Sequence, residues 1–349
     1  GSLAGSGTVT STSGTPTLTL GGDNTSTTFS GAIQNGTGVV SIYKSGTGVF
    51  TLSGSNSYTG ATTVPYGQIK LGAAQTNLTA YDISSGAFLD LGGYSATIGS
   101  LAGAGSVTST ASGSITLTAG NASSTTFSGI IQDGSGTVAF TKAGTGTLTL
   151  SGTNTFSGGL IVSNGILKVG AVGNSLFTPL GSYAGTVSVS NGATLDLNGY
   201  TLGTSQALTI TGGGYGSIGA LTNTSSTPVT YSGLITLGTL STAKISSSNG
   251  GITLSNPGTI NGTGKTLTLG GTATSGNTVA SIIGLGTTGA LEKVDSGTWI
   301  LSGNNTYTGT TTITLGTLTV SGGTGPYTWS EFFPAASIPI TTQQECLTC

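Results

Sequence analysis

The sequence predicts an all-β fold in which short strands stack as successive coils of a solenoid. First, Gly, Ser and Thr make up about half of the 349 residues, yet 35% of the residues are hydrophobic and the net charge is only −2, so the chain can bury a core. Second, Thr and Leu alternate in many short runs, which is the pattern of half-buried strands. Third, long segments of the sequence recur, as they do in repeat architectures.

The first repeated unit returns almost unchanged in the next part of the chain. GSLAGSGTVTST at residues 1–12 reappears as GSLAGAGSVTST at residues 99–110, a shift of 98 residues. KSGTGVFTLSGSNSYTG at residues 44–60 reappears with the same shift as KAGTGTLTLSGTNTFSG. A third, more divergent copy, KVDSGTWILSGNNTYTG, occupies residues 293–309. We therefore expect a solenoid over residues 1–325, with units that start near residue 1, near residue 99 and in the 200s.

The second unit is longer than the first. AFLDLGGY at residues 87–94 matches ATLDLNGY at residues 193–200 with a shift of 106, so the second unit carries an insertion of eight residues. In both units Gly, Asn and Ser-Gly pairs interrupt the alternating runs and supply tight turns. Strands this short cannot each close a core. Stacking them coil upon coil buries Leu, Ile and Val and leaves Thr and Ser outside.

Three segments of the solenoid resemble a known repeat. LSGSNSYTG at residues 52–60, LSGTNTFSG at 150–158 and LSGNNTYTG at 301–309 are each preceded by a Gly-rich strand and followed by an apolar alternation. In this they resemble the autotransporter-associated β-strand repeat, found in the passenger regions of bacterial autotransporters and related large surface proteins. The resemblance implies a right-handed parallel β-helix (β-solenoid) and a bacterial extracellular or cell-surface location. Such solenoids serve as stalks, adhesins and enzyme scaffolds, so the resemblance leaves the function open.

The missing residue types narrow the possible functions. The chain has no His and no Arg, and its seven Lys are widely spread. Without His it lacks Ser-His-Asp and Cys-His machinery and imidazole metal ligands. Seven scattered Lys cannot form the basic surface that nucleic acid requires. We therefore expect no enzyme activity, no cofactor, no metal site and no nucleic-acid partner.

The ends of the chain and its hydropathy bear on location. Residue 1 is Gly and no charged, apolar leader follows, so we expect that any signal peptide has been removed. No apolar stretch approaches the roughly 18 residues of a membrane helix, so no membrane span is expected. Both cysteines lie within the last four residues. The cysteine-free body is compatible with the extracellular location that the resemblance implies.

Two uncharged positions carry the same residue type in all three copies. One holds an asparagine, which we predict to be a turn residue whose amide bonds local backbone or the next coil, with ligand binding as the alternative. The other holds an aromatic ring, which we predict to pack from coil to coil, with a sugar platform as the alternative. The residues are Asn56, Asn154 and Asn305, and Tyr58, Phe156 and Tyr307.

Charged residues also recur at equivalent positions, namely Lys44, Lys142 and Lys293, and Asp90 and Asp196. We predict that these charges are solvated and keep the protein soluble. Leucines flank Asp90 on both sides, so the twofold alternation of a strand points its carboxylate outward. A polysaccharide-cleaving enzyme would need two carboxyl groups roughly 5 to 9.5 Å apart.

The last residues, 326–349, differ from the solenoid in composition. They contain no Gly, three of the eight Pro and both cysteines. Proline excludes a long helix or a central strand, so we expect an extended tail that docks on the last coil as a cap or on a neighbouring subunit. The predicted docking residues are Tyr327, Trp329, Phe332, Phe333, Ile338 and Ile340, and Cys346 and Cys349 are predicted to form a local or intersubunit disulfide.

Together these features favour a non-catalytic structural subunit of a bacterial extracellular fibre or surface layer. Unlike ends of a solenoid that meet head to tail produce an open filament, and strand addition with aromatic anchors would join the subunits. The alternative is a monomeric adhesin passenger that binds glycans or proteins on a host or neighbouring cell. A polysaccharide-active β-helix enzyme is the third hypothesis.

Overall fold

The computed structural model describes residues 1–322. The predictions for the tail residues Tyr327, Trp329, Phe332, Phe333, Ile338, Ile340, Cys346 and Cys349 therefore lie outside the described residues. Within residues 1–322 the fold is all-β, with a single turn of 3₁₀ helix, η1 (Tyr215–Ser217), among short strands. The chain divides into two compact units, which we call unit 1 (Gly1–Ile161 and Gly173–Gly185) and unit 2 (Val162–Val172 and residues from 186 onward).

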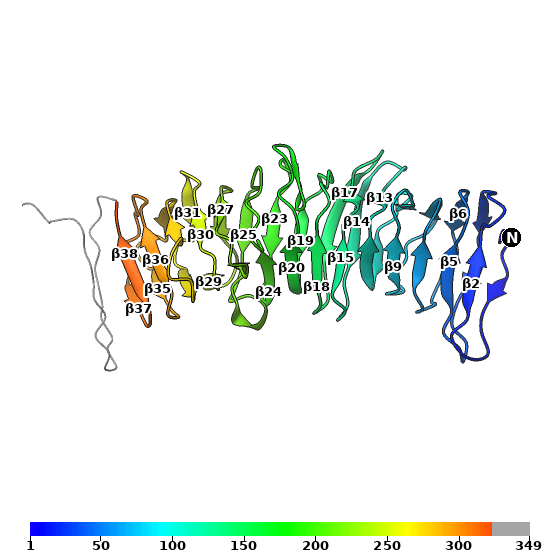
Figure 1. Cartoon of the computed structure of the whole chain (residues 1–349), viewed down its shortest axis with the longest axis horizontal. Coiled ribbons are helices and arrows are strands. Elements are labelled where there is room, and N and C mark those ends of the chain that lie inside the picture. The colour runs from blue at the N-terminus through cyan, green and yellow to red at the C-terminus, as the bar shows by residue number, and fades with distance from the viewer. Residues whose placement is uncertain (323–349) are drawn as a thin grey trace, which may run out of the picture. The chain divides into compact units, whose positions relative to one another are not determined.

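Unit 1 consists of parallel strands stacked into sheets, each named here by its first strand (Figure 1). The β2 sheet contains β2 (Thr17–Leu20), β5 (Ser41–Lys44), β7 (Thr62–Val64), β9 (Ala80–Ile83), β12 (Ser100–Gly103), β15 (Thr125–Phe127) and β18 (Thr147–Leu150). The β3 sheet contains β3 (Thr27–Phe29), β6 (Val49–Leu52), β8 (Gln68–Leu71), β10 (Phe88–Asp90), β13 (Ser106–Thr108) and β16 (Ile130–Ile131). The β11 sheet contains β11 (Ala96–Ile98), β14 (Ser114–Ala119) and β17 (Thr137–Lys142), and β1 (Thr8–Val9) pairs with β4 (Ala32–Ile33).

Unit 2 repeats this organisation, and β19 (Leu160–Val162) lies where the chain passes from one unit to the other. The β20 sheet contains β20 (Gly165–Val169), β24 (Ala193–Asp196), β26 (Leu221–Asn223), β29 (Thr242–Ser247), β32 (Thr266–Gly271), β35 (Ala290–Lys293) and β37 (Thr311–Ile313). The β23 sheet contains β23 (Val187–Val189), β25 (Leu208–Ile210), β28 (Ile235–Leu237), β31 (Thr259–Asn261) and β34 (Ile282–Gly284). The β27 sheet contains β27 (Val229–Tyr231), β30 (Ile252–Leu254), β33 (Thr278–Val279), β36 (Thr298–Leu301) and β38 (Thr317–Val320).

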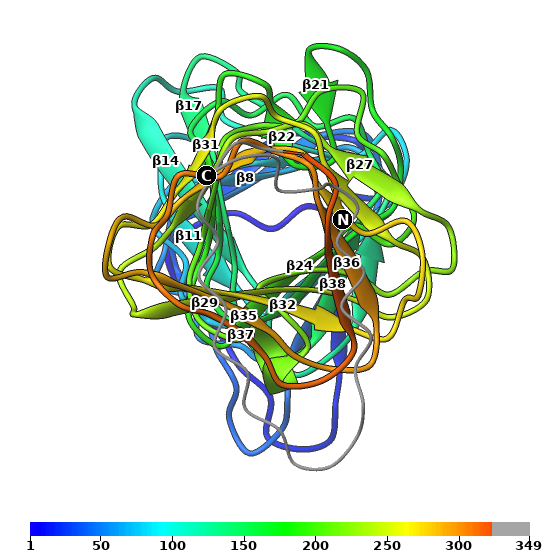
Figure 2. The ribbon, with the colours of Figure 1, turned by 90° about the vertical axis from the view of Figure 1, so that its left-hand side faces the viewer.

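Neighbouring strands of a sheet come from successive coils, which confirms the predicted solenoid. Thr17 of β2 pairs with Ser41 of β5, and Ser114 of β14 pairs with Thr137 of β17, so one coil takes 24 or 23 residues at these places. Figure 2 shows the coil of unit 2 end-on, with β29, β32, β35 and β37 on one side and β36 and β38 on another.

The alternation of Thr and Leu fixes which side chains fill the coil. In β14, Ile115, Leu117 and Ala119 are buried, whereas Thr116 and Thr118 between them are half-buried. Most inward positions of the other strands hold the same residue types, because burying aliphatic and aromatic side chains lowers the free energy of the folded chain. The apolar core is thus a column inside the coils, and hydroxyl groups line much of the outside.

The eight-residue insertion in the second sequence repeat forms a local hairpin within unit 1. β21 (Phe177–Thr178) and β22 (Gly181–Ser182) pair antiparallel within the segment where the eight extra residues fall. The hairpin is attached to the coil of unit 1 by Asn154 and Ser182, since the Asn154 N–H donates to the Thr178 carbonyl and the Ser182 N–H donates to the Phe156 carbonyl. The hairpin thus forms a small antiparallel sheet that is separate from the parallel sheets.

Among residues 1–322, no helix has the length and apolar character needed to cross a membrane. The same residues contain no group of three or more His, Cys, Asp or Glu side chains placed to hold a metal ion.

Candidate functional site

The repeated asparagines join neighbouring coils. Oδ1 of Asn154, which is fully buried, accepts a hydrogen bond of 2.7 Å from the Ile131 N–H, and its Nδ2 donates to the Pro179 carbonyl at 2.7 Å. Ile131 lies one coil earlier and Pro179 lies in the inserted hairpin, so one side chain bonds both neighbours. The corresponding bonds from Ile33 to Asn56 and from Ile283 to Asn305 are both 2.9 Å long.

The repeated aromatic rings lie inside the coils. Tyr58, Phe156 and Tyr307 are 0%, 1% and 6% exposed, so they offer no face to a ligand. The Tyr58 hydroxyl lies 2.8 Å from Oγ1 of Thr62, and Tyr307 lies 2.8 Å from Thr311 in the same way. Phe156 has no hydroxyl, and the residue four positions later is Leu160. Its ring instead contacts Phe140, with ring centres 6.2 Å apart. The two copies with a tyrosine therefore have a threonine four residues later, whereas the copy with a phenylalanine has a leucine there.

The repeated lysines are buried, so the prediction that they are solvated is wrong. Lys44, Lys142 and Lys293 are 0%, 1% and 0% exposed. In each copy Nζ donates to the carbonyl groups of the next two residues, at distances of 2.6 to 3.0 Å. The ammonium group therefore binds carbonyls of the turn that ends the strand. Burial lowers the pKa of Lys44, and it lowers the pKa of Lys142 and of Lys293 to about 8.

The repeated aspartates are also buried, which corrects the second charge prediction. Asp90 is 0% exposed and Asp196 is 1% exposed. Asp90 accepts hydrogen bonds from the N–H groups of Gly92 and Thr110 and from the Thr110 hydroxyl, and Lys70 lies 3.5 Å away. Burial alone would raise the pKa of Asp90, but these bonds and the Lys70 charge outweigh it and hold the pKa below its usual value. Asp196 has equivalent partners in Asn198, Thr224 and Lys168.

Register explains why an outward aspartate is not exposed. Asp90 of β10 pairs with Lys70 of β8 and with Thr108 of β13, so a longer side chain of the preceding coil lies beside it. The alternation within one strand gives the direction of a side chain, but the neighbouring coils decide whether water reaches it. For Lys44 the alternation alone indicates burial, because Ile42, two residues earlier on β5, faces the same side and is also buried.

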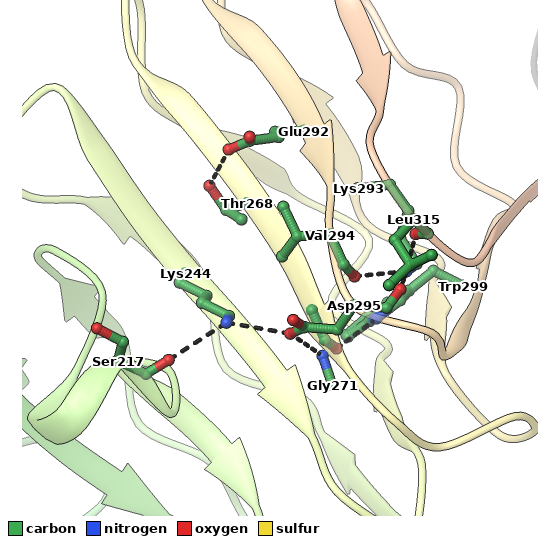
Figure 3. Close-up of polar contacts among 11 residues, drawn as sticks. Ser217, Lys244, Thr268, Gly271, Glu292, Lys293, Val294, Asp295, Trp299 and Leu315 are labelled. Carbon is green, nitrogen blue, oxygen red and sulfur yellow. Dashed lines mark hydrogen bonds and ion pairs between the residues drawn. The ribbon is translucent and has the colours of Figure 1, made fainter. Parts of the chain in front are cut away.

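Around the third copy, charged side chains also bond to groups on neighbouring coils, although Asp295 is partly exposed (Figure 3). Nζ of Lys244 lies 3.1 Å from Oδ2 of Asp295, and the Gly271 N–H donates to the same oxygen at 2.8 Å. Glu292 lies in the same region, but Figure 3 shows its carboxylate directed away from Asp295, toward Thr268, whose hydroxyl donates to it at 3.1 Å. The two carboxyl groups do not face each other across a shared space, as the acid pair of a glycosidase would.

The other carboxylates of residues 1–322 also have hydrogen-bond partners, with one exception. Asp23 accepts from Thr25, and Asp133 accepts from Ser157 and from the Val138 N–H. Asp82 is exposed, and it has neither a hydrogen bond nor an ion pair within the described part of the chain. Sequence reasoning did not single it out, because its strand shows no feature that separates it from any other surface aspartate.

Comparison with known proteins identifies the repeated segments. The sequence matches the family described as passenger-associated-transport-repeat at residues 42–65, 140–169 and 291–320. Each match contains one of the buried lysines, one of the coil-joining asparagines and one of the buried rings. The matched segments thus share these three buried or coil-joining side chains.

A curated protein is similar over most of the chain. The adhesin BmaC autotransporter of Brucella suis biovar 1 (strain 1330) is 34% identical over 436 aligned residues, which cover 89% of this chain. The chain spans 12% of the length of that relative. No solved structure shows a significant match.

Proposed function

Since the chain belongs to the passenger-type β-helix repeat proteins of autotransporters, we propose that it is part of a bacterial surface adhesin that binds without catalysing a reaction. The similarity to this family supports a location outside the cell or on the cell surface. The curated relative carries the description adhesin, and this supports the same role here.

The main support for the proposal is that the repeated charged side chains bond to the protein's own backbone and neighbouring coils. The repeated lysines donate to turn carbonyls, and the repeated aspartates accept bonds from the next coil. These groups stabilise the stack and are not available to a substrate. What the coils present to the outside is mainly hydroxyl groups on a rigid frame, which suits contact with a surface and provides no acid–base pair.

Cell binding by the isolated chain tests the proposal. Fluorescently labelled chain is added over a range of concentrations to cultured epithelial cells and to bacterial cells, and unlabelled chain is used as the competitor. We expect saturable binding that the competitor removes. Binding that rises linearly and resists the competitor, on every cell type, would contradict an adhesin.

Self-association into a fibre is the second candidate, and the low net charge of −2 favours it because little repulsion separates the copies. Electron microscopy and sedimentation of the full chain, and of a chain truncated after residue 325, test this candidate. Filaments that the truncation abolishes are expected, and monomers at every concentration would exclude it.

A further inference from the structure

We propose that the outer face of the β2 sheet in unit 1 binds an uncharged polysaccharide, with Tyr43 and Asp82 as its main contacts. This inference rests on the proposed adhesin function and names the class of ligand.

Five residues form one line across neighbouring strands of this sheet. Each is the register partner of the next, from β2 through β5, β7 and β9 to β12. Neighbouring strands lie about 4.8 Å apart, so residues two strands apart are separated by about 10 Å along the stack. The residues, in order, are Thr19, Tyr43, Thr63, Asp82 and Ala102.

The side chains of this line point away from the core. Tyr43 is 38% exposed, whereas Ile42 and Lys44 on either side of it are buried. Asp82 is exposed, and its neighbours on β9, Tyr81 and Ile83, are buried. A phenol ring, a hydroxyl group and a carboxylate are therefore presented together to solvent.

This combination matches the chemistry of a saccharide. The faces of a sugar ring carry C–H groups that pack on an aromatic ring, and the Tyr43 hydroxyl remains free to bond at the edge. An ionised carboxylate only accepts hydrogen bonds, so Asp82 fits the O–H donors of a sugar. A hydroxyl group such as that of Thr63, on the strand between them, both donates and accepts. A few such polar groups beside an aromatic surface are typical of ligand sites.

Charge selects among saccharides. Within residues 1–322 Asp82 has no cationic partner, and the nearby Lys44 is buried and bound to carbonyl groups. A sialylated or sulfated chain would bring its negative charges toward an uncompensated carboxylate. The site therefore favours uncharged sugars. The contacts follow the stack across several strands. An extended chain of sugars can therefore reach more of them than a single sugar unit can.

The contacts are held in place before the ligand arrives. Tyr43 and Asp82 lie on strands that pair with neighbours on both sides, so little backbone freedom is lost on binding. An ideal Cβ at Gly103 of β12 would lie 2.7 Å from Oδ1 of Asp82. Because residue 103 is glycine, the carboxylate has room to lie over the next coil.

A glycan array tests the proposal. The full chain and its variants are applied to immobilised neutral, sialylated and sulfated oligosaccharides. We expect the wild-type chain to bind neutral oligosaccharides, with affinity that increases with length. Tyr43→Ala and Asp82→Asn are each expected to weaken binding about tenfold or more, which corresponds to the loss of one strong contact. Both sites are on the surface, and circular dichroism verifies that each variant is folded.

The matched control is Phe88→Ala. Phe88 is 39% exposed, much like Tyr43, but it lies on β10 of the β3 sheet. Binding should be unchanged in this variant. Wild-type preference for sialylated or sulfated chains, equal loss in Phe88→Ala, or full binding by Tyr43→Ala would each overturn the inference. A chain that binds cells but no neutral oligosaccharide refutes this site and leaves the adhesin proposal intact, whereas a chain that binds no cells refutes the adhesin proposal itself.

Discussion

The buried Lys142 is expected to make the stability of the protein increase with pH between 7 and 9.5. Burial lowers its pKa from 10.5 in the unfolded chain to about 8 in the folded one. Between these values the unfolded chain binds more protons than the folded chain, so the free energy of unfolding rises with pH. Below pH 8 both states are protonated and the folded state bears the whole burial cost, about 3 kcal/mol for a shift of this size. Removing the proton from the folded state relieves that cost.

The gain expected from Lys142 between pH 7 and pH 9.5 is about 2 kcal/mol, since the unfolded chain is still mostly protonated at pH 9.5. Urea unfolding followed by circular dichroism measures it at several pH values in this range. Higher pH is avoided because burial raises the pKa of Tyr58 and of Tyr81, so ionisation of tyrosine in the unfolded chain would then destabilise the fold.

Lys142→Met is the comparison that isolates this residue. The methionine leaves the carbonyls of Ala143 and Gly144 without the ammonium donor, which shifts the stability by a similar amount at each pH. The slope of stability against pH is therefore the quantity to compare, and the wild-type slope should be the steeper. Parallel curves for the two proteins would refute the argument that this amine is depressed by burial.

Three further changes test the bonds between coils, each by urea unfolding. Asn154→Ala leaves the buried Ile131 N–H without its acceptor and should cost about 1 to 3 kcal/mol, more than Asn56→Ala at the half-buried position; equal costs would show that burial does not set the penalty. Tyr58→Phe removes one hydrogen bond and should cost about 1 kcal/mol, and an unchanged stability would mean that the hydroxyl contact contributes nothing. Asp90→Ala leaves buried N–H donors unpaired and should cost about 3 kcal/mol at pH 7, and less as the pH falls through the lowered pKa of the wild-type carboxylate; a cost independent of pH would point to packing.

The fold could be predicted from the sequence because the signals that specify a solenoid are local and repeated. Alternation in Thr147–Leu150 gives the strand and its inward face, and the recurrence of residues 1–12 at 99–110 gives the stacking. The inserted hairpin shows the limit of this reasoning. The excess of eight residues locates it, but the antiparallel pairing of β21 with β22 depends on a turn that no repeat pattern encodes.

The charged positions were predicted wrongly for two different reasons. For Lys44 the necessary signal was present, since counting by twos from Ile42 places it inside; the rule that lysines are solvated was applied in its place. For Asp90 the signal was absent, because its burial depends on Lys70 and Thr110, each about 20 residues away on neighbouring coils. The register between coils is a tertiary property, and one strand alone does not carry it.

The buried lysines also affect how the protein withstands digestion. Trypsin cuts only after Lys or Arg, because the basic side chain must enter a deep pocket of the protease. The chain has seven Lys and no Arg, and in three of the seven the amine is inside the coil. A brief digest of the folded chain should therefore leave fragment ends only at Lys70, Lys168, Lys244 and Lys265. In a medium rich in secreted proteases, each unit of the repeat thus protects one of its own cleavage sites simply by folding.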